Sequence, residues 1–225
     1  NGNIGKKFKL NTTVTFTTAR NEVTATNDDG TARILGGYYF NGQSQSVTVF
    51  EKGQTPGYFY GYKTMGLFQS ADEITKAPSQ NGAQPGDIRF VDVNGDGVIN
   101  AQDQTKIGDP FPDFTMGWNV TLEYKGFDFN AFTYASVGND VYRAYERNAN
   151  YTNKARDVLA RWTGPGSTND ARYPRYSFTD GNSNIRVSDR YVEDGSFIKL
   201  KNLQLGYTLP ASATGKVFSR VRVYV

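Results

Sequence analysis

Hydrophobic and polar residues alternate along several stretches of the chain, with the period of two that is typical of β-strands. The pattern is clearest from residue 8 to residue 17. There one face carries Phe8, Leu10, Thr12, Val14 and Phe16, and the opposite face carries Lys9, Asn11, Thr13, Thr15 and Thr17. These positions predict a strand with one largely apolar face and one polar face.

A hairpin is predicted in the middle of the chain. Alternation runs from Met116 to Tyr124, and it resumes from Phe127 to Tyr134 after the pair Lys125-Gly126. Two alternating stretches joined by a short connection that contains glycine indicate a β-hairpin with a tight turn.

The stretch from Ser196 to Leu209 alternates too, but its apolar residues change face halfway. They occupy even-numbered positions up to Leu200 and odd-numbered positions from Leu203 onward. A shift by one residue is the signature of a β-bulge, which we predict at Lys201-Asn202. Pro210 is expected to end this strand, and a last strand is predicted from Arg220 to Val225.

Weaker alternation and long polar segments complete the pattern. The weaker strand candidates are Ile34 to Phe40, Ser46 to Phe50, Tyr58 to Lys63 and Ile88 to Asp92. Long polar segments run from Gln69 to Gly86 and from Asn139 to Val187, and the second contains helical spacing from Asn153 to Trp162 that predicts a short loop helix. Short turns on one side of a sheet and long loops on the other are typical of outer-membrane barrels.

The polar strand faces indicate what surrounds the sheet. Threonine and asparagine side chains would lose their hydrogen bonds to water if such a face packed into a dry core. We therefore expect them to face water or a polar plug, as in the lumen of a large barrel. A soluble sheet with one solvated face explains any single strand equally well, and that alternative stays open.

Composition supports an all-β protein and excludes most enzyme chemistry. The 225 residues include 15 Tyr and 15 Phe, hydrophobic residues total only 37%, and the net charge is +3. The sequence has no Cys and no His, which removes thiolate and His-ligated metal sites and the usual catalytic triads, while paired-carboxylate hydrolysis remains formally possible. No basic run recommends nucleic acid as a partner, and we expect no enzyme.

One motif carries specific chemistry. Residues 92 to 103 read DVNGDGVINAQD, the spacing of a calcium-binding loop with glycine at its sixth position. The predicted ligands are Asp92, Asn94, Asp96, the backbone carbonyl of Val98, Asn100 and Asp103. The segment before the loop looks extended, so the entering helix of an EF-hand is missing. The alternative is a loop of Asx-turns that binds no metal.

A second candidate is aromatic. Tyr58, Phe59, Tyr60 and Tyr62 are expected either to stack on sugar rings or, as the commoner use, to form an aromatic girdle at a membrane interface.

Three longer stretches resemble the C-terminal half of SusC/RagA-type TonB-linked outer-membrane proteins of Bacteroidetes. They are GYKTMGLFQ from Gly61 to Gln69, GDIRFVDVNGDGVINAQDQTKIG from Gly86 to Gly108 with the residues that follow it, and RYVEDGSFIKLKNLQLGYTLP from Arg190 to Pro210. A lesser match is RWTGPG from Arg161 to Gly166. They occur in the family's order and span most of the chain.

The resemblance implies that residues 1–225 form the C-terminal portion of a large antiparallel transmembrane β-barrel of 22 strands with long extracellular loops. The plug, the segment that binds TonB and the final strands would lie outside this stretch. The resemblance also implies location in the outer membrane, contact with its lipid, a SusD-like surface lipoprotein as partner, and import of oligosaccharides or peptides energised through TonB. It carries the calcium-type loop over onto Asp92, Asn94, Asp96, Asn100 and Asp103.

Two other functions remain as alternatives. The 92–103 motif also resembles one dockerin repeat, which would indicate a secreted calcium-binding β module involved in glycan binding. No second copy of the motif follows it. A β-rich glycan-processing enzyme would need a carboxylate pair in a concave site, which the sequence does not identify.

Overall fold

A computed structural model describes residues 2–3, 8–27, 32–40, 43–144, 156–214 and 218–225. The chain divides into two compact units. The first, which we call the sheet unit, comprises Asn1–Arg20, Pro112–Asn139 and Gly195–Val225. The second, the loop unit, comprises Asn21–Phe111 and Asp140–Asp194.

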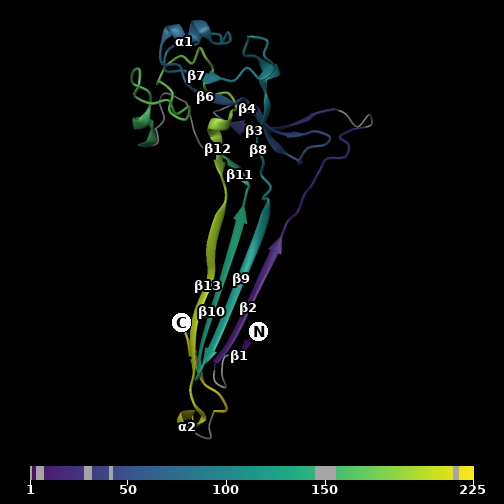
Figure 1. Ribbon diagram of the computed structural model, residues 1–225, viewed down its shortest axis with the longest axis vertical. Helices are drawn as coiled ribbons and strands as arrows, with labels where there is room; N and C mark the ends of the chain where they lie inside the picture. The colour runs from purple at the N-terminus through teal and green to yellow at the C-terminus, as the bar shows by residue number, and fades with distance from the viewer. Residues whose placement is uncertain (1, 4–7, 28–31, 41–42, 145–155, 215–217) are drawn as a thin grey trace. The chain divides into compact units, whose positions relative to one another are not determined.

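The sheet unit is one antiparallel sheet of six strands, four of them long (Figure 1). Its spatial order is β1-β2-β9-β10-β13-β14. The strands are β1 (Gly2–Asn3), β2 (Phe8–Thr17), β9 (Phe114–Tyr124), β10 (Phe127–Val137), β13 (Phe197–Thr208) and β14 (Arg222–Tyr224), and the short helix α2 (Ala211–Thr214) lies between the last two. All the long strands were predicted from alternation.

The predicted hairpin turn and bulge are both confirmed. Lys125 and Gly126 connect β9 to β10 with φ angles of 47° and 90°. Two successive positive φ angles match the twist of the flanking strands, and glycine adopts the second without steric cost. In β13, Asn202 pairs with Phe132 and Leu200 pairs with Thr133, so Lys201 is the extra residue of the bulge.

The two faces of this sheet differ in chemistry, as predicted. Register places the even-numbered residues of β2 and β9 and the odd-numbered residues of β10 on the same face, joined by the apolar residues of β13. Many large side chains of this apolar face are between 47% and 75% exposed: Val14, Phe16, Trp118, Ile198, Leu200, Leu203 and Leu205. Among the described residues of the sheet unit, Ala135 is the only buried hydrophobic one. The sheet unit therefore contains no dry core of its own.

Aromatic pairs mark both ends of the apolar face. Phe8 packs near Tyr124, and Phe127 packs near Tyr207, with ring centroids 6.4 and 4.5 Å apart, at the end with the tight turn. Phe16 stacks on Phe114 at 5.0 Å at the other end. The nine residues from Phe8 to Phe16 span about 27 Å along the strand. At a tilt of about 40° this is about 20 Å, close to the apolar band of about 25 Å in outer-membrane barrels.

The loop unit contains small sheets. A four-stranded sheet has the order β3-β4-β5-β8, and two pairs are β6-β7 and β11-β12. The strands are β3 (Ile34–Phe40), β4 (Gln43–Phe50), β5 (Tyr58–Gly61), β6 (Thr64–Leu67), β7 (Ile88–Phe90), β8 (Thr105–Gly108), β11 (Asp140–Tyr142) and β12 (Val192–Asp194). The helical segments are α1 (Ala71–Lys76), η1 (Ala101–Asp103), η2 (Arg156–Ala160) and η3 (Asp189–Tyr191).

Two apolar clusters form the core of the loop unit. One contains Tyr62, Leu67, Ile88 and Phe90, with Ile99, Trp162 and Ala171 packed against it. The other contains Val47, Phe59 and Val187, with Ile107, Tyr142 and Val192 packed against it. Both clusters join residues from 47–107 to residues from 142–192. The two long connections of the sheet therefore pack on one another rather than extend as separate loops.

Several sequence-based expectations need correction in this unit. The predicted strand from Tyr58 to Lys63 ends at Gly61, and the polar segment after Gln69 contains helix α1. Of the predicted loop helix, residues 153–155 lie outside the described residues, and Arg156–Ala160 is a 3₁₀ helix rather than an α-helix. Among the residues that the structure describes, no helix has the length and hydrophobicity needed to cross a bilayer.

The aromatic candidates also need correction. Tyr58, Phe59 and Tyr62 are only 2%, 8% and 9% exposed, because they pack in the core of the loop unit. The hydroxyl of Tyr60 accepts a hydrogen bond from Arg33 at 2.6 Å. The three buried rings can serve neither a sugar site nor an interfacial girdle. In the sheet unit, aromatic pairs at the two ends of the apolar face are the exposed alternative to these buried rings.

Candidate functional site

The polar face of the sheet unit carries a ladder of side-chain hydrogen bonds. The Asn202 amide donates to Asn130 at 2.8 Å, and the Asn130 amide donates to Thr121 at 2.9 Å and to Asn119 at 3.2 Å. This ladder crosses three strands. Toward the tight turn the same face carries ion pairs between Lys9 and Glu123 and between Asp128 and Arg222.

The two faces of the sheet suit two different solvents. The amides, hydroxyls and charges of one face keep their hydrogen bonds only beside water or other polar groups. The exposed Leu, Val and aromatic side chains of the other face lower their free energy only by leaving water. Exposed apolar side chains spread over four strands form a surface of the kind that soluble monomers rarely leave uncovered. The sheet therefore suits a boundary between an apolar and a polar environment.

The predicted calcium loop follows β7 in the loop unit, and its last three residues form η1. The carboxylate of Asp92 accepts hydrogen bonds from the backbone N–H groups of Gly95 at 2.7 Å and Gly97 at 2.8 Å. Gly97 has a φ angle of 81°, which permits the sharp turn at the sixth position. Asn94 and Val98 are exposed. The backbone around Val98 is held by residue 79, whose N–H donates to Gly97 and whose carbonyl accepts from Ile99.

Two further predicted ligands of this loop are Asp96, which is exposed, and Asn100, which is partly buried. The Asp96 carboxylate accepts hydrogen bonds from the Val98 N–H at 2.9 Å and the Asn94 amide at 2.9 Å. These bonds hold the pKa of Asp96 below its usual value. The Asn100 side chain accepts from the Gln102 N–H and so caps η1.

The twelfth loop position differs from the expectation of a free ligand. Asp103 is fully buried, and its two carboxylate oxygens accept from the N–H groups of Val93 at 2.9 Å and Asn100 at 2.7 Å. The donor set, all oxygen, fits a hard cation such as calcium. Within the described ranges, however, no three acidic side chains gather closely enough to hold a metal ion. The residues therefore fit calcium in identity, while their arrangement here is that of an Asx-turn loop.

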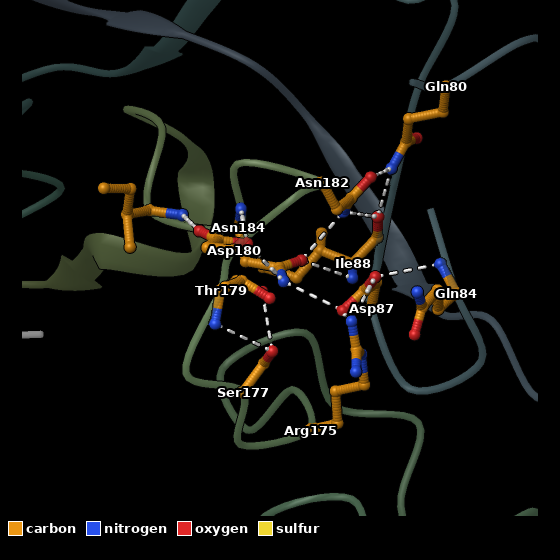
Figure 2. A network of polar contacts seen from close by, with 11 residues as sticks. Gln80, Gln84, Asp87, Ile88, Arg175, Ser177, Thr179, Asp180, Asn182 and Asn184 are labelled. Carbon is orange, nitrogen blue, oxygen red and sulfur yellow. Dashed lines mark hydrogen bonds and ion pairs between the residues drawn. The ribbon is translucent and has the colours of Figure 1, made fainter. Parts of the chain in front are cut away.

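Sequence reasoning missed a second polar constellation, which surrounds the backbone of Ile88 in β7 (Figure 2). Asp87 is fully buried, and its carboxylate accepts from Arg175 Nε at 2.7 Å, the Asn184 amide at 3.0 Å and the Gln84 N–H at 2.9 Å. The Gln80 amide bridges the backbone of β7, because it donates to the Ile88 carbonyl and accepts from the Phe90 N–H.

Asn182 joins these two groups. It is fully buried, accepts from Gln80, and donates to the Ile88 carbonyl at 3.0 Å and to Asn184 at 2.8 Å. Asp180 accepts from the N–H groups of Asn184 and Ile185 and from the Asn184 side-chain amide. We call the set Gln80, Asp87, Arg175, Asn182 and Asn184 the polar lock. No local motif in the sequence indicates it, because its two halves lie about ninety residues apart.

Comparisons with known proteins identify relatives of the chain. No family model matches it. TonB-dependent receptor P3 of Formosa agariphila is 37% identical over 193 residues, which cover 84% of this chain and 18% of that protein. TonB-dependent receptor P26 of the same organism is 34% identical, covering 72% of this chain and 17% of the receptor. TonB-dependent receptor SusC of Bacteroides thetaiotaomicron is 27% identical, covering 91% and 19%.

The chain belongs to the TonB-dependent receptor family. Proteins of this family reside in the outer membrane, so the expected location is confirmed, and the relatives are receptors rather than enzymes, as expected. The chain spans about a fifth of the length of the curated relatives that it matches.

A structural comparison supports the fold. The RagAB peptide transporter superposes with a TM-score of 0.72 over 99% of this chain and 23% of the transporter chain, at 22% sequence identity. The RagAB peptide importer in its closed-closed state gives a TM-score of 0.68 over 98% of this chain and 23% of that chain, also at 22% identity. The all-β antiparallel architecture predicted from alternation is therefore confirmed.

Proposed function

We propose that the receptor containing this chain imports oligosaccharides or peptides across the outer membrane, energised through TonB and paired with a SusD-like surface lipoprotein. In this proposal the chain supplies part of the C-terminal half of a 22-stranded barrel, with further strands and a plug contributed by the rest of the receptor. The sheet unit forms barrel wall, and the loop unit lies on the extracellular side.

The observation that carries this proposal is the sheet unit itself, with an exposed apolar face bounded by aromatic pairs and a hydrogen-bonded polar face. A wall of this kind needs lipid on one side and a wet interior on the other. The connections between the strands add support. One long connection joins β2 to β9, and another joins β10 to β13. Both begin and end at the sheet end opposite the Lys125-Gly126 turn.

The names of the similar proteins support TonB dependence and a peptide as one class of cargo. SusC is a TonB-dependent receptor, and RagAB is a peptide transporter. Both an oligosaccharide and a peptide carry many hydrogen-bonding groups, which the amides and hydroxyls of the polar face can match.

Import is tested in the native host. Deletion of the gene should abolish uptake of the oligosaccharide or peptide that supports receptor-dependent growth, and the full-length gene should restore it. A protonophore or disruption of tonB should abolish uptake in the complemented strain. Uptake that persists after deletion, or that is insensitive to both treatments, contradicts the proposal.

The partner is tested separately. Full-length receptor carrying an affinity tag should copurify from mild detergent with a surface lipoprotein in a stoichiometric complex. A receptor that purifies without one under conditions that preserve its fold contradicts this part of the proposal and leaves import to be judged by the uptake experiment.

We also propose that the 92–103 loop binds calcium through Asp92, Asn94, Asp96, the Val98 carbonyl, Asn100 and Asp103. The spacing, the oxygen-only donor set and the glycine turn at Gly97 support this. When bound, calcium would supply a structural crosslink within the loop. The dockerin alternative is less well supported, because the loop follows strand β7 and its last three residues form only a short 3₁₀ segment.

Calcium binding is tested by titrating the metal-stripped full-length receptor with calcium and, in parallel, with luminescent terbium. Asp96→Asn should weaken binding at least tenfold, since it removes one anionic ligand. Asp170→Asn, which changes an exposed carboxylate elsewhere in the loop unit, should leave binding unchanged. Absence of saturable metal binding, or equal metal affinity in the two variants, would contradict the calcium proposal.

A further inference from the structure

The polar lock joins two parts of the chain that are far apart in sequence. One is the segment 62–90, which contains β6, α1 and β7, and the other is the segment 162–190. We infer that these two segments form a single cooperative unit. They unfold together, and when they move they move together as one rigid body.

The first observation is that the lock is buried and its polar groups are partnered. Asp87 and Asn182 are fully buried, and Gln80 and Asn184 are 8% and 7% exposed. Separating the segments would remove Arg175 and Asn184 from a buried carboxylate. It would also remove Asn182 from Gln80 and from the Ile88 carbonyl. A buried polar group that loses its partner carries the full cost of desolvation, and more so when it is charged.

The second observation is that the same segments are joined beyond the lock. The N–H of Tyr62 donates to the Val187 carbonyl at 2.9 Å, and the Asp189 N–H donates to the Tyr62 carbonyl at 3.0 Å. At the far end the N–H of Leu67 donates to the Asn169 side chain at 2.8 Å. In the second segment, hydrogen bonds to 62–90 therefore lie both before and after the lock residues in sequence.

Apolar contacts add to the polar ones. The Trp162 ring and Ala171 pack against the cluster that contains Leu67, Ile88 and Phe90. The Trp162 N–H also donates to the Gln69 side chain at 3.2 Å. Neither segment can leave without exposing part of this cluster to water.

These contacts explain why opening should be cooperative. Strands β6 and β7 contain only four and three residues, so their own ladder supplies few hydrogen bonds. The buried groups of Asp87, Asn182 and Asn184 have hydrogen-bond partners on the other segment. When one segment opens, the other loses its hydrogen bonds and its apolar contacts at once, which is the condition for a shared opening reaction.

The lock also defines the register between the segments. An apolar cluster tolerates small shifts, whereas amides and carboxylates are satisfied only in one alignment. A register fixed in this way makes movement of one loop past the other costly. The consequence for the receptor is that this part of the loop unit behaves as a rigid element.

Hydrogen exchange on the full-length receptor, read by mass spectrometry, tests the inference. Asn182→Ala should lower amide protection about tenfold or more in peptides from both 62–90 and 162–190. Peptides from β9 and β10 should be unchanged. Arg172→Gln is the matched control, because it breaks an exposed ion pair with Asp170 within the second segment. It should leave both segments as protected as in the wild type.

A second arm covers the case in which the variant does not fold. In wild-type receptor, increasing denaturant should remove the protection of both segments at the same concentration. Protection lost from only one segment in Asn182→Ala, or two separate denaturant midpoints in the wild type, would overturn the inference.

Discussion

Glu51 shows how a single carboxylate holds a turn in the loop unit. It accepts from Arg33 at 2.8 Å and from the Tyr58 hydroxyl at 2.6 Å, and these bonds lower its pKa, while burial raises the pKa of Tyr58. Because the folded pKa lies below the unfolded one, the stabilisation is present above the unfolded value and is lost as pH falls through the folded pKa. The partners are partly exposed, so solvent screening keeps the contribution below about 1 kcal/mol.

We therefore predict a small, pH-dependent effect of Glu51→Gln. Near neutral pH, amide protection of the adjoining 53–54 turn should be about two- to fivefold lower in the variant than in the wild type. The ratio should approach one as the pH is lowered through the folded pKa, where wild-type Glu51 is protonated too. Comparing the two proteins at each pH by hydrogen exchange removes the intrinsic pH dependence. A ratio that does not change with pH contradicts the assignment.

At the scale of residues, features with a signal in the neighbouring sequence could be predicted, and features that depend on distant contacts could not. The turn residues Lys125 and Gly126 and the bulge at Lys201 could be predicted because their signals lie within a few residues of one another. The burial of Tyr58 and Phe59 could not be predicted, since both rings pack on residues from other parts of the chain. The polar lock was missed for the same reason. The spacing of the calcium motif predicted which oxygens share a loop, but not the burial of Asp103.

At the scale of elements, the hairpin between β9 and β10 depends on its turn. Gly126 has a φ angle of 90°, and an added Cβ would lie 2.9 Å from the Thr208 carbonyl oxygen. Gly126→Ala should destabilise the hairpin by about 1–2 kcal/mol. Lys125→Asn should be neutral or stabilising, because asparagine tolerates positive φ better than lysine.

These two variants are compared by folding full-length receptor into detergent micelles and measuring the folded fraction from its altered mobility on unheated gels. Gly126→Ala should lower the folded fraction, and Lys125→Asn should not. Equal folding of the glycine variant and the wild type would show that the turn conformation matters less than its geometry implies.

Strands could be predicted where each face of the strand has the same surroundings along its whole length. Strand β2 was predicted with its exact bounds, because period-two alternation is uninterrupted from Phe8 to Thr17. In the loop unit the short strands have mixed surroundings, and the strand predicted up to Lys63 ends at Gly61. Helix α1 was missed, although Ser70 and Glu73 supply a recognisable capping signal: the Ser70 hydroxyl accepts from the Glu73 N–H, and the Glu73 carboxylate accepts from the Gln69 N–H.

For the whole molecule, the account depends on the two-faced sheet. Leu203 and Gln204 are neighbours in β13 but lie on opposite faces. Register aligns Leu203 with Ala131, Val120 and Thr12, so it lies midway between the aromatic pairs at the two ends of the apolar face. Leu203 is 59% exposed, so substitution there would be nearly neutral on a water-facing surface.

The most direct test introduces the same charge on each face. Full-length receptors carrying Leu203→Arg or Gln204→Arg would be folded into lipid bilayers, and their unfolding free energies would be compared with that of the wild type. Arginine at the bilayer midplane should cost about 2–4 kcal/mol in Leu203→Arg, whereas Gln204→Arg should change stability by less than about 1 kcal/mol. Equal and small effects of the two substitutions, or a larger cost at Gln204, would contradict the placement of the apolar face in lipid.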